Sequence, residues 1–251
     1  MYTPRTESVV VLDNVPAAPG VRLLTLTAPR AWSFRPGQVA ELAADPGTEG
    51  FFAIASAPAE VAAESGRLAF LVKAEGSDSE PLMRLATGAA ITLRGPFGEG
   101  FDLPSPVAKH DLLFITAGTA LAAIRSAVVE AIGHGACARV AVVIGLRHAA
   151  DLCFADEVLA WQQRGVHVRL ALSYGEADIE LALPLRAERG RVQAQIADIA
   201  NADTHVFIAG SEELEDNVTF VLVAAGVKPH NIQRNYRPDG RSEAPAALGD
   251  G

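Results

Sequence analysis

At 251 residues, the chain is long enough to bury a sizeable core in one large or two ordinary domains, and its composition of 49% hydrophobic and 20% charged residues is typical of a globular protein. A formal net charge of −9 argues against nucleic acid or an anionic membrane surface as a partner. Two cysteines, Cys137 and Cys153, are too few for a disulfide framework, a structural zinc site or a cysteine-ligated iron–sulfur cluster. They predict buried thiols in a reducing compartment.

The sequence also argues against targeting and membrane segments. The N-terminal apolar run at 9–12 is too short for a signal peptide, and the apolar stretch at 117–132 is interrupted by Arg125 and Glu130. We therefore expect no membrane span and a cytoplasmic location, or the reducing lumen or stroma of an organelle after processing.

The first hundred residues predict a small antiparallel β-barrel. Short runs rich in Val, Leu, Ile and Phe alternate with Pro, Gly and Asp, which is the pattern of strands joined by turns. One helix is expected among them at 79–86, with Ser79 as its cap and Pro81 in its first turn. The expected strands are 8–15, 21–28, 38–43, 52–56, 67–73 and 91–94.

The pattern changes after the Pro-Ser-Pro sequence at 104–106. Apolar strands then alternate with helices, which predicts a parallel sheet covered on both faces. We expect two domains: a β-barrel at 1–106 and an α/β domain at 107–236, followed by a disordered tail at 237–251. The expected strands of the second domain are 112–116, 139–144, 166–172, 205–209 and 231–236, and its helices are 120–132, 154–164, 192–200 and 212–225.

The strand ends of the α/β half are candidate ligand sites, because an open parallel sheet binds ligands at the carboxyl ends of its strands. The turn at 116–119 is small and contains Gly118, so backbone N–H groups and a helix N-terminus can approach a pyrophosphate. Gly210 follows another strand, and Arg147 follows a third, where it can pair with a phosphate or stack on an adenine. The alternatives are an ordinary strand–helix turn and a surface arginine.

Two segments of the barrel half are candidates for a flavin. Paired aromatics stand beside small residues at 51–58, so that a ring can cover a flavin face while backbone amides reach its edge. The alternative is a pair of core aromatics. The sequence at 76–79 precedes the barrel helix and is a second candidate phosphate site, provided that the Asp78 carboxylate faces away from it. The histidines show no metal-ligand spacing, and we find no nucleophile elbow, Walker loop or zinc-protease motif.

Taken in order, these segments resemble the ferredoxin–NADP⁺ reductase superfamily over residues 6–236. The resemblance is closest to the small FAD/NAD(P)-binding oxidoreductases of plants and bacteria. It implies that a nicotinamide passes a hydride to a flavin, which passes electrons on. The matching segments are 51–58, 71–73 with 76–85, 95–101, 113–126, 145–157, 190–193, 209–214 and 235–236.

Several positions in these segments depart from the pattern of that family, among them Ala123, which stands where the dinucleotide turn of the family has a proline. Gly50 stands where the family has an arginine that holds the flavin phosphates, and Ala53 stands where it has a serine that bonds near flavin N5. Ala120 replaces the second glycine of the dinucleotide turn, and Ala209 replaces the cysteine beside the nicotinamide. An alanine in such a turn clashes only if it adopts positive φ or touches the pyrophosphate.

The resemblance implies two sets of cofactor-binding residues. The flavin set is Phe52, Ala53, Ile54, Ala55, Ser56, Lys73, Gly76, Ser77 and Ser79. The dinucleotide set is Thr116, Gly118, Thr119, Arg147 and Gly210. Tyr236 is expected to cover the flavin from the nicotinamide side, or else to begin an exposed tail.

The sequence therefore predicts a flavin-dependent NAD(P)H oxidoreductase that binds FAD and NAD(P)H and serves an unidentified electron acceptor. The alternative is a catalytically degenerate scaffold or binding subunit of the same fold, which the lost motif residues favour. We expect no intrinsic iron–sulfur cluster, because no cysteine follows Cys153. The net charge makes an acidic ferredoxin a less favoured partner.

Overall fold

The computed structural model describes residues 3–63, 66–76, 78–133, 139–174, 185 and 187–235. Contacts divide the chain into two units. Unit 1 comprises Met1–Asp102 with Thr119–Gly133, and unit 2 comprises Leu103–Gly118 with His134–Gly251. The chain therefore passes between the units at three places along its length.

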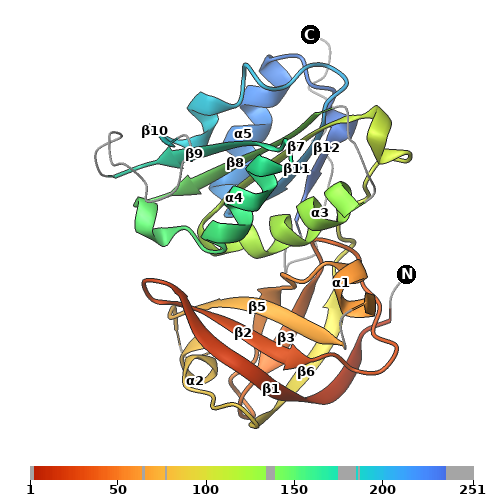
Figure 1. Cartoon of the computed structure of the whole chain (residues 1–251), viewed down its shortest axis with the longest axis vertical. Helices are drawn as coiled ribbons and strands as arrows, with labels where there is room; N and C mark the ends of the chain where they lie inside the picture. The colour runs from red at the N-terminus through yellow and green to blue at the C-terminus, as the bar shows by residue number, and fades with distance from the viewer. Residues whose placement is uncertain are drawn as a thin grey trace. The chain divides into compact units, whose positions relative to one another are not determined.

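Unit 1 is an antiparallel barrel (Figure 1), which confirms the fold expected for the first hundred residues. Its six strands lie in the order β4-β3-β6-β1-β2-β5, and a bridge between Ile54 and Phe70 joins the end of β4 to β5. Alternate side chains of the strands fill the interior, where Leu24, Leu42 and Leu93 are fully buried. The strands are β1 (Arg5–Ala18), β2 (Val21–Thr27), β3 (Val39–Ala43), β4 (Gly50–Ala53), β5 (Arg67–Lys73) and β6 (Ala90–Phe97).

Two short helices flank the barrel. Helix α1 (Pro58–Ala63) was not expected, although Pro58 occupies its first position and the Glu60 carboxylate accepts a hydrogen bond of 2.7 Å from the Ala57 N–H. Helix α2 (Ser79–Met83) lies within the expected segment, but Ser79 does not cap it. Its hydroxyl instead accepts a hydrogen bond of 3.0 Å from the Glu75 N–H, because Ser79 is already inside the helix.

Helix α3 (Leu121–Gly133) belongs to unit 1 by its contacts. The Arg125 guanidinium donates to both carboxylate oxygens of Glu60 at 2.9 Å and to the Ala55 carbonyl at 2.7 Å. The Ser126 hydroxyl donates to the Ser56 carbonyl at 2.8 Å. These bonds join α3 to the segment that links β4 to α1.

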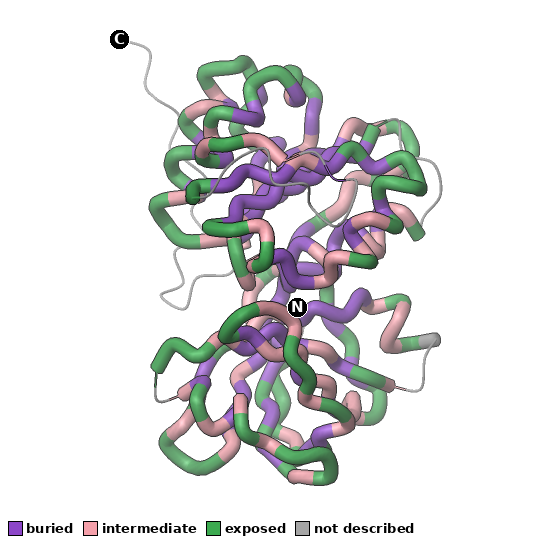
Figure 2. Tube along the Cα trace, turned by 60° about the vertical axis from the view of Figure 1, so that its left-hand side comes forward, coloured by how far each residue is buried: buried purple, intermediate pink, exposed green. Residues whose placement is uncertain are grey.

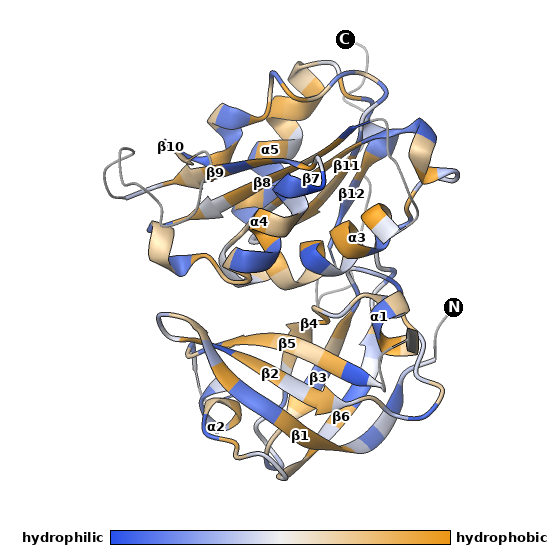
Figure 3. Ribbon diagram, viewed as in Figure 1, coloured by the Kyte–Doolittle hydropathy of each residue, from blue (hydrophilic) through white to orange (hydrophobic). Residues whose placement is uncertain are grey.

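Unit 2 is a parallel sheet with the strand order β10-β9-β8-β7-β11-β12, as expected for the second half of the chain (Figure 1). The central strands are almost entirely apolar and buried, as Figures 2 and 3 show. Its strands are β7 (Asp111–Ala117), β8 (Arg139–Leu146), β9 (His167–Leu172), β10 (Ala187–Arg189), β11 (His205–Ala209) and β12 (Ile232–Arg234), and its α-helices are α4 (Ala155–Gln163) and α5 (Glu212–Ala224).

The prediction of a helix at 192–200 is wrong. Only a 3₁₀ turn forms there, at Val192–Gln195. The Arg169 guanidinium takes the Gln195 carbonyl at 3.0 Å, and the Ile199 N–H bonds to Ile196 at 3.1 Å instead. An α-helix would have needed the Gln195 carbonyl for Ile199. Strand β10 and the 3₁₀ segments Val107–Lys109, Gly118–Ala120, Ala149–Asp151 and Pro229–Asn231 complete the described structure.

None of the described helices is long and apolar enough to cross a bilayer.

Candidate functional site: the carboxyl edge of the parallel sheet and strand β4

The turn after β7 has the geometry of an anion-binding turn. Gly118 has a φ of +56°, which favours glycine, and a side chain added there would meet nothing within 4 Å. The Thr116 hydroxyl is buried and has no hydrogen-bond partner among the described residues. Ala120 is not among the described non-glycine residues with positive φ, so its methyl group introduces no backbone strain. The turn therefore keeps its shape without the second glycine of the family.

Arg147 lies on the next strand end, beside an aromatic residue that the sequence analysis missed. Strands β8 and β9 pair up to Leu146 and Leu172, and the Tyr174 N–H donates to the Arg147 carbonyl at 2.9 Å. The Tyr174 side chain is 62% exposed, and its ring centroid lies 6.0 Å from that of His148. Arg147 is exposed, and its guanidinium forms no ion pair with any described residue. This edge thus offers an exposed cation and an exposed ring.

Gly210 lies at the same edge, because Ala209 pairs with Thr116 in the neighbouring strand. A side chain at Gly210 would lie 2.8 Å from a methyl group of Leu214, so a larger residue there requires the Leu214 side chain to shift. Ser211 caps the helix by accepting from the Leu214 N–H at 3.3 Å. Three acidic residues fill the first turn of α5, which makes its N-terminus a poor site for a phosphate.

Strand β4 places Gly50 beside the ring of Phe52 and the carboxylate of Asp78. Gly50 and Phe52 pair with the buried Leu42 and Ala40 of β3, so both face the barrel interior. A side chain at Gly50 would lie 2.9 Å from a carboxylate oxygen of Asp78 and 2.9 Å from the Phe52 ring. The Asp78 carboxylate therefore faces the position where the family has its phosphate-binding arginine. It does not face away, as a phosphate site at 76–79 requires.

Most backbone donors at 54–57 are already used within unit 1. The Ile54 N–H donates to Gln38 at 3.1 Å, and the Ala55 N–H donates to Ala69 at 2.8 Å. The Ser56 hydroxyl accepts from the Ala69 N–H at 2.9 Å and donates to the Arg67 carbonyl at 3.3 Å. These groups hold the barrel closed, so the structure does not leave them available for a ligand.

The other predicted flavin residues lie at the end of β5 and in the turn after it. The Lys73 ammonium pairs with Glu75. Gly76 is exposed, with a φ of +119°. Ala53 is half-buried on the outer face of β4, opposite Val39. Ser77 and Tyr236 lie outside the described residues, and Thr119 is half-buried at the first turn before α3.

Phe51, one of the paired aromatics of the predicted flavin segment, lies on the outer face of β4 beside Phe97 of β6. The Phe51 side chain is 44% exposed, and its ring meets that of Phe97 edge to face, with centroids 5.5 Å apart. The Arg94 guanidinium lies 5.0 Å from the Phe97 ring centroid and pairs with Glu41 at 3.3 Å. The alternation of β4 would have identified Phe51 as the outward aromatic.

Cys153 is buried and inert. Burial, and after it the negative charge of Asp151, raises the pKa of its thiol to about 11, so the thiol stays protonated at neutral pH. Among the residues that the structure describes, no group of three His, Cys, Asp or Glu side chains is arranged to hold a metal ion.

Comparison with known proteins agrees with this architecture. Residues 114–219 match the family described as the oxidoreductase NAD-binding domain. Ferredoxin–NADP reductase B of Sorangium cellulosum is 28% identical over 147 residues, which are 55% of this chain and 58% of the relative. The gamma subunit of sulfhydrogenase 1 of Pyrococcus furiosus is 26% identical over 204 residues, covering 80% of this chain and 67% of the relative. The chain thus matches little more than half of the length of the first of these relatives.

Solved structures extend the likeness over both units. The cytochrome P450 reductase of Amycolatopsis superposes with a TM-score of 0.78 at 22% identity, covering 94% of this chain and 70% of that one. A ferredoxin NADP⁺ reductase of Neisseria gonorrhoeae with bound FAD and NADP superposes with a TM-score of 0.74 at 16% identity, covering 92% and 98% of the two chains. At these identities the superpositions establish the fold.

Proposed function

We propose that the chain is a flavin-dependent NAD(P)H oxidoreductase similar to the ferredoxin–NADP⁺ reductases, in which unit 2 binds the dinucleotide and unit 1 binds the flavin. The observation that carries the proposal is the carboxyl edge of the parallel sheet. There the turn at Thr116–Thr119 lies beside a strand end that presents an exposed tyrosine and an arginine with no ion-pair partner among the described residues.

The residues at this edge fit a nicotinamide dinucleotide. Gly118 permits close approach of the pyrophosphate, and the buried Thr116 hydroxyl has no hydrogen-bond partner among the described residues. Tyr174 offers a ring for adenine to stack on, and Arg147 offers a guanidinium for a phosphate. Because the Arg147 guanidinium can pair with the additional 2′-phosphate, NADPH is the expected dinucleotide.

At Gly50, unit 1 holds the diphosphate of FAD less favourably than the arginine of the family would. The position of the expected arginine is Gly50, and the carboxylate of Asp78 stands in front of it. A carboxylate repels a phosphate and supplies no donor. Helix α2, with five residues, is too short to compensate. When bound, a flavin would supply the acceptor for the hydride of the dinucleotide.

The alternative function, a non-catalytic scaffold or binding subunit, is favoured by that same carboxylate. A barrel that repels the cofactor diphosphate keeps the fold without the redox chemistry. Dinucleotide binding alone does not separate the two functions, because both keep the edge of unit 2 intact.

One experiment separates them. Purified protein is dialysed, its absorption spectrum is recorded, and NADPH oxidation with ferricyanide is then measured at increasing FAD concentrations. The oxidoreductase is expected to lose FAD on dialysis and to recover activity with a saturable dependence on added FAD. NADPH binding without any FAD-dependent oxidation supports the scaffold. Failure to bind NADPH contradicts the assignment of unit 2.

A further inference from the structure

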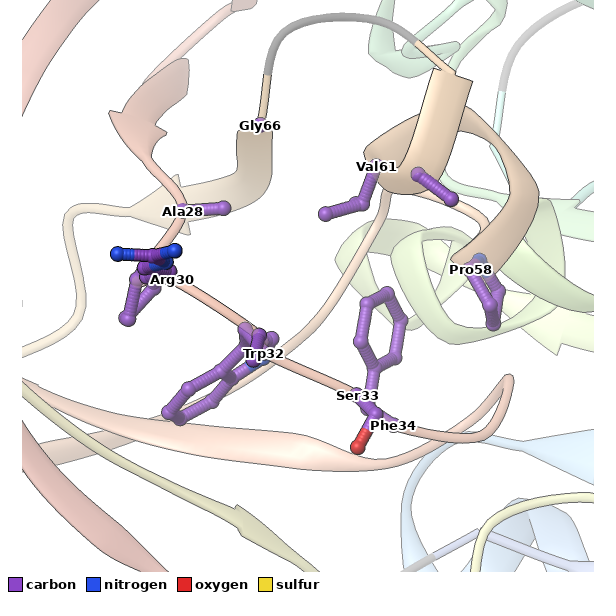
Figure 4. A pocket seen from close by; sticks show the side chains of 11 residues that line it. Ala28, Arg30, Trp32, Ser33, Phe34, Pro58, Val61 and Gly66 are labelled. Atoms are coloured by element: carbon purple, nitrogen blue, oxygen red, sulfur yellow. The ribbon is translucent and has the colours of Figure 1, made fainter.

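Unit 1 contains a cavity of about 580 Å³ that involves none of the proposed cofactor-binding residues (Figure 4). Its volume is in the range of small-molecule sites. It lies between the connection from β2 to β3 and helix α1. The lining residues are Ala28, Pro29, Arg30, Ala31, Trp32, Ser33, Phe34, Pro58, Val61, Ala62 and Gly66.

The walls of the cavity are apolar and firmly packed. Trp32 and Phe34 are 7% and 4% exposed and belong to the barrel core, and Val61 packs against that core. Figure 4 shows the Phe34 ring and the Val61 side chain extending toward each other, one from the loop and one from α1. Two aromatic side chains backed by a core form a preformed surface for a flat apolar molecule.

The polar groups at the cavity favour an anionic ligand that accepts a hydrogen bond. The Trp32 indole N–H is buried and has no hydrogen-bond partner among the described residues. The Arg30 guanidinium forms no ion pair with any described residue, and Arg30 lines the cavity. Of the eleven lining residues none is acidic, which is notable in a chain with a net charge of −9.

A second arginine holds the loop in an unusual conformation. Ala31 has a φ of +55°, which is rare for a residue with a side chain. The Arg5 guanidinium donates to the carbonyls of Arg30 and Ala31 at 3.3 Å each and lies 5.6 Å from the Trp32 ring centroid. Its ion pair with Glu7 is long, at 4.0 Å, so much of its charge remains beside the indole. Strained backbone held by such contacts is typical of ligand sites.

We propose that this cavity binds a flat, mainly apolar carboxylate of the size of naphthoate. The ring lies against Trp32 and Phe34, while the carboxylate accepts from the Trp32 indole N–H and pairs with Arg30. The site is independent of the proposed function, because it uses no dinucleotide or flavin residue.

The test is a titration of ¹⁵N-labelled full-length protein with 2-naphthoate, without added cofactor. The chain has two tryptophans, so the Trp161→Phe variant identifies the Trp32 indole signal. We expect a saturable shift of that signal, at least about tenfold weaker binding in Val61→Phe, and similar weakening in Arg30→Gln. Arg84→Gln is the matched control, because Arg84 is exposed, directly follows α2 and does not line the cavity.

Three results overturn the proposal: no saturable shift of the Trp32 signal, unchanged binding in the cavity-filling variant, or equal binding of the neutral 2-naphthylmethanol. If Val61→Phe does not fold, Ala62→Trp decides instead, because Ala62 lines the cavity on the exposed side of α1. Arg30→Gln must weaken the binding of 2-naphthoate and leave the binding of 2-naphthylmethanol unchanged. Equal loss for both contradicts the ion pair.

Discussion

At Gly50 a single residue decides how much room and which charge a ligand meets. The carboxylate of Asp78 and the ring of Phe52 occupy the space into which a side chain would grow. Asp78 makes no side-chain cap to α2, so its carboxylate has no structural role at the helix start that would explain its orientation. The simplest physical consequence is electrostatic: an anion is opposed at this position.

Asp78→Asn is therefore expected to tighten FAD binding about fivefold, because removing one like charge near the diphosphate is worth about 1 kcal/mol. Quenching of flavin fluorescence measures it, and Asp45→Asn, which removes an exposed acid elsewhere in unit 1, is the control. Gly50→Arg alone is expected to gain little, since the new guanidinium would pair with Asp78. Combined with Asp78→Ser, it is expected to gain more. An unchanged affinity in Asp78→Asn would sink this account.

Arg147 is a test of dinucleotide choice. If its guanidinium holds a 2′-phosphate, Arg147→Ala is expected to weaken NADPH binding roughly ten- to a hundredfold and to leave NADH nearly unchanged, because a charge-assisted hydrogen bond is worth about 1.5–3 kcal/mol. Calorimetric titration of both dinucleotides measures it. Arg189→Ala, at the end of β10, controls for loss of a positive charge in the same sheet. Equal losses for both dinucleotides would retire this role.

His205 makes the stability of unit 2 sensitive to mild acid. Burial, and then the charges of His110 and His230, lowers its pKa below the usual 6.5, against a smaller opposing effect of Asp203. The folded state therefore takes up this proton less readily than the unfolded chain. The stability that unit 2 gains from keeping His205 neutral is fully present above pH 6.5. It is lost as the pH falls from 6.5 through the lower pKa of His205 in the folded state.

His205→Phe keeps the edge-to-face ring contact with His110, whose centroid lies 4.8 Å away, and removes the titration. We expect the urea midpoint of this variant to fall less between pH 7.5 and pH 5 than that of the unmodified chain. His148→Phe, an exposed histidine at the other end of the sheet, serves as the comparison. Parallel declines in all three proteins would show that other groups dominate.

At the scale of elements, an ion pair and several hydrogen bonds join α3 to α1 and the segment before it. Burial alone would raise the pKa of Glu60, and the hydrogen bonds from Arg125 and the Ala57 N–H outweigh it, so the net shift is downward. The stabilisation from this carboxylate is therefore present above pH 4.5 and is lost as the pH falls through the lowered pKa. The Arg125 side chain is only 13% exposed, so water can do little to solvate its charge if Glu60 is neutralised.

Glu60→Gln is expected to destabilise the chain by about 1–3 kcal/mol, because it leaves the Arg125 guanidinium mostly buried without its counter-charge. Urea unfolding followed by circular dichroism measures this. Glu80→Gln is the control, since it breaks an exposed pair with Arg84 and should change stability by less than about 0.5 kcal/mol. Similar losses in the two variants would contradict a special role for the Glu60–Arg125 pair.

The elements that sequence predicts well are those whose hydrophobic pattern decides their structure. Strands β7 and β8 are continuous apolar runs, and they formed where expected because both of their faces are buried. The prediction of a helix at 192–200 was wrong, although the buried residues Val192, Ile196 and Ile199 have helical spacing. The deciding contact came from Arg169, distant in sequence, and no local pattern contains it.

The candidate site divides in the same way. The turn at Gly118 was identified from its own residues, because a local conformation depends on local sequence. Tyr174 was missed because its place beside Arg147 depends on the pairing of β8 with β9. The orientation of the Asp78 carboxylate was left open by the sequence for the same reason, since only the fold brings α2 to Gly50.

At the scale of the whole molecule, unit 1 is discontinuous in sequence. A fragment of residues 1–106 lacks α3, and with it the partners of Glu60, Ala55 and Ser56. We expect this fragment to melt at a lower temperature than a fusion of residues 1–102 to residues 119–133 through a Gly-Ser linker. Thermal melts by circular dichroism compare them, and Arg125→Ala with Ser126→Ala in the fusion should abolish the gain. A fragment as stable as the fusion would contradict the assignment of α3 to unit 1.

The three crossings of the chain also limit how such a protein is recombined. A gene exchange that joined a foreign dinucleotide module at residue 106 would carry away the native α3 and leave Glu60 facing a helix that had not coevolved with it. We therefore expect such an exchange to give a stable protein only when the foreign module carries an arginine one turn into that helix, or when Glu60 is replaced as well.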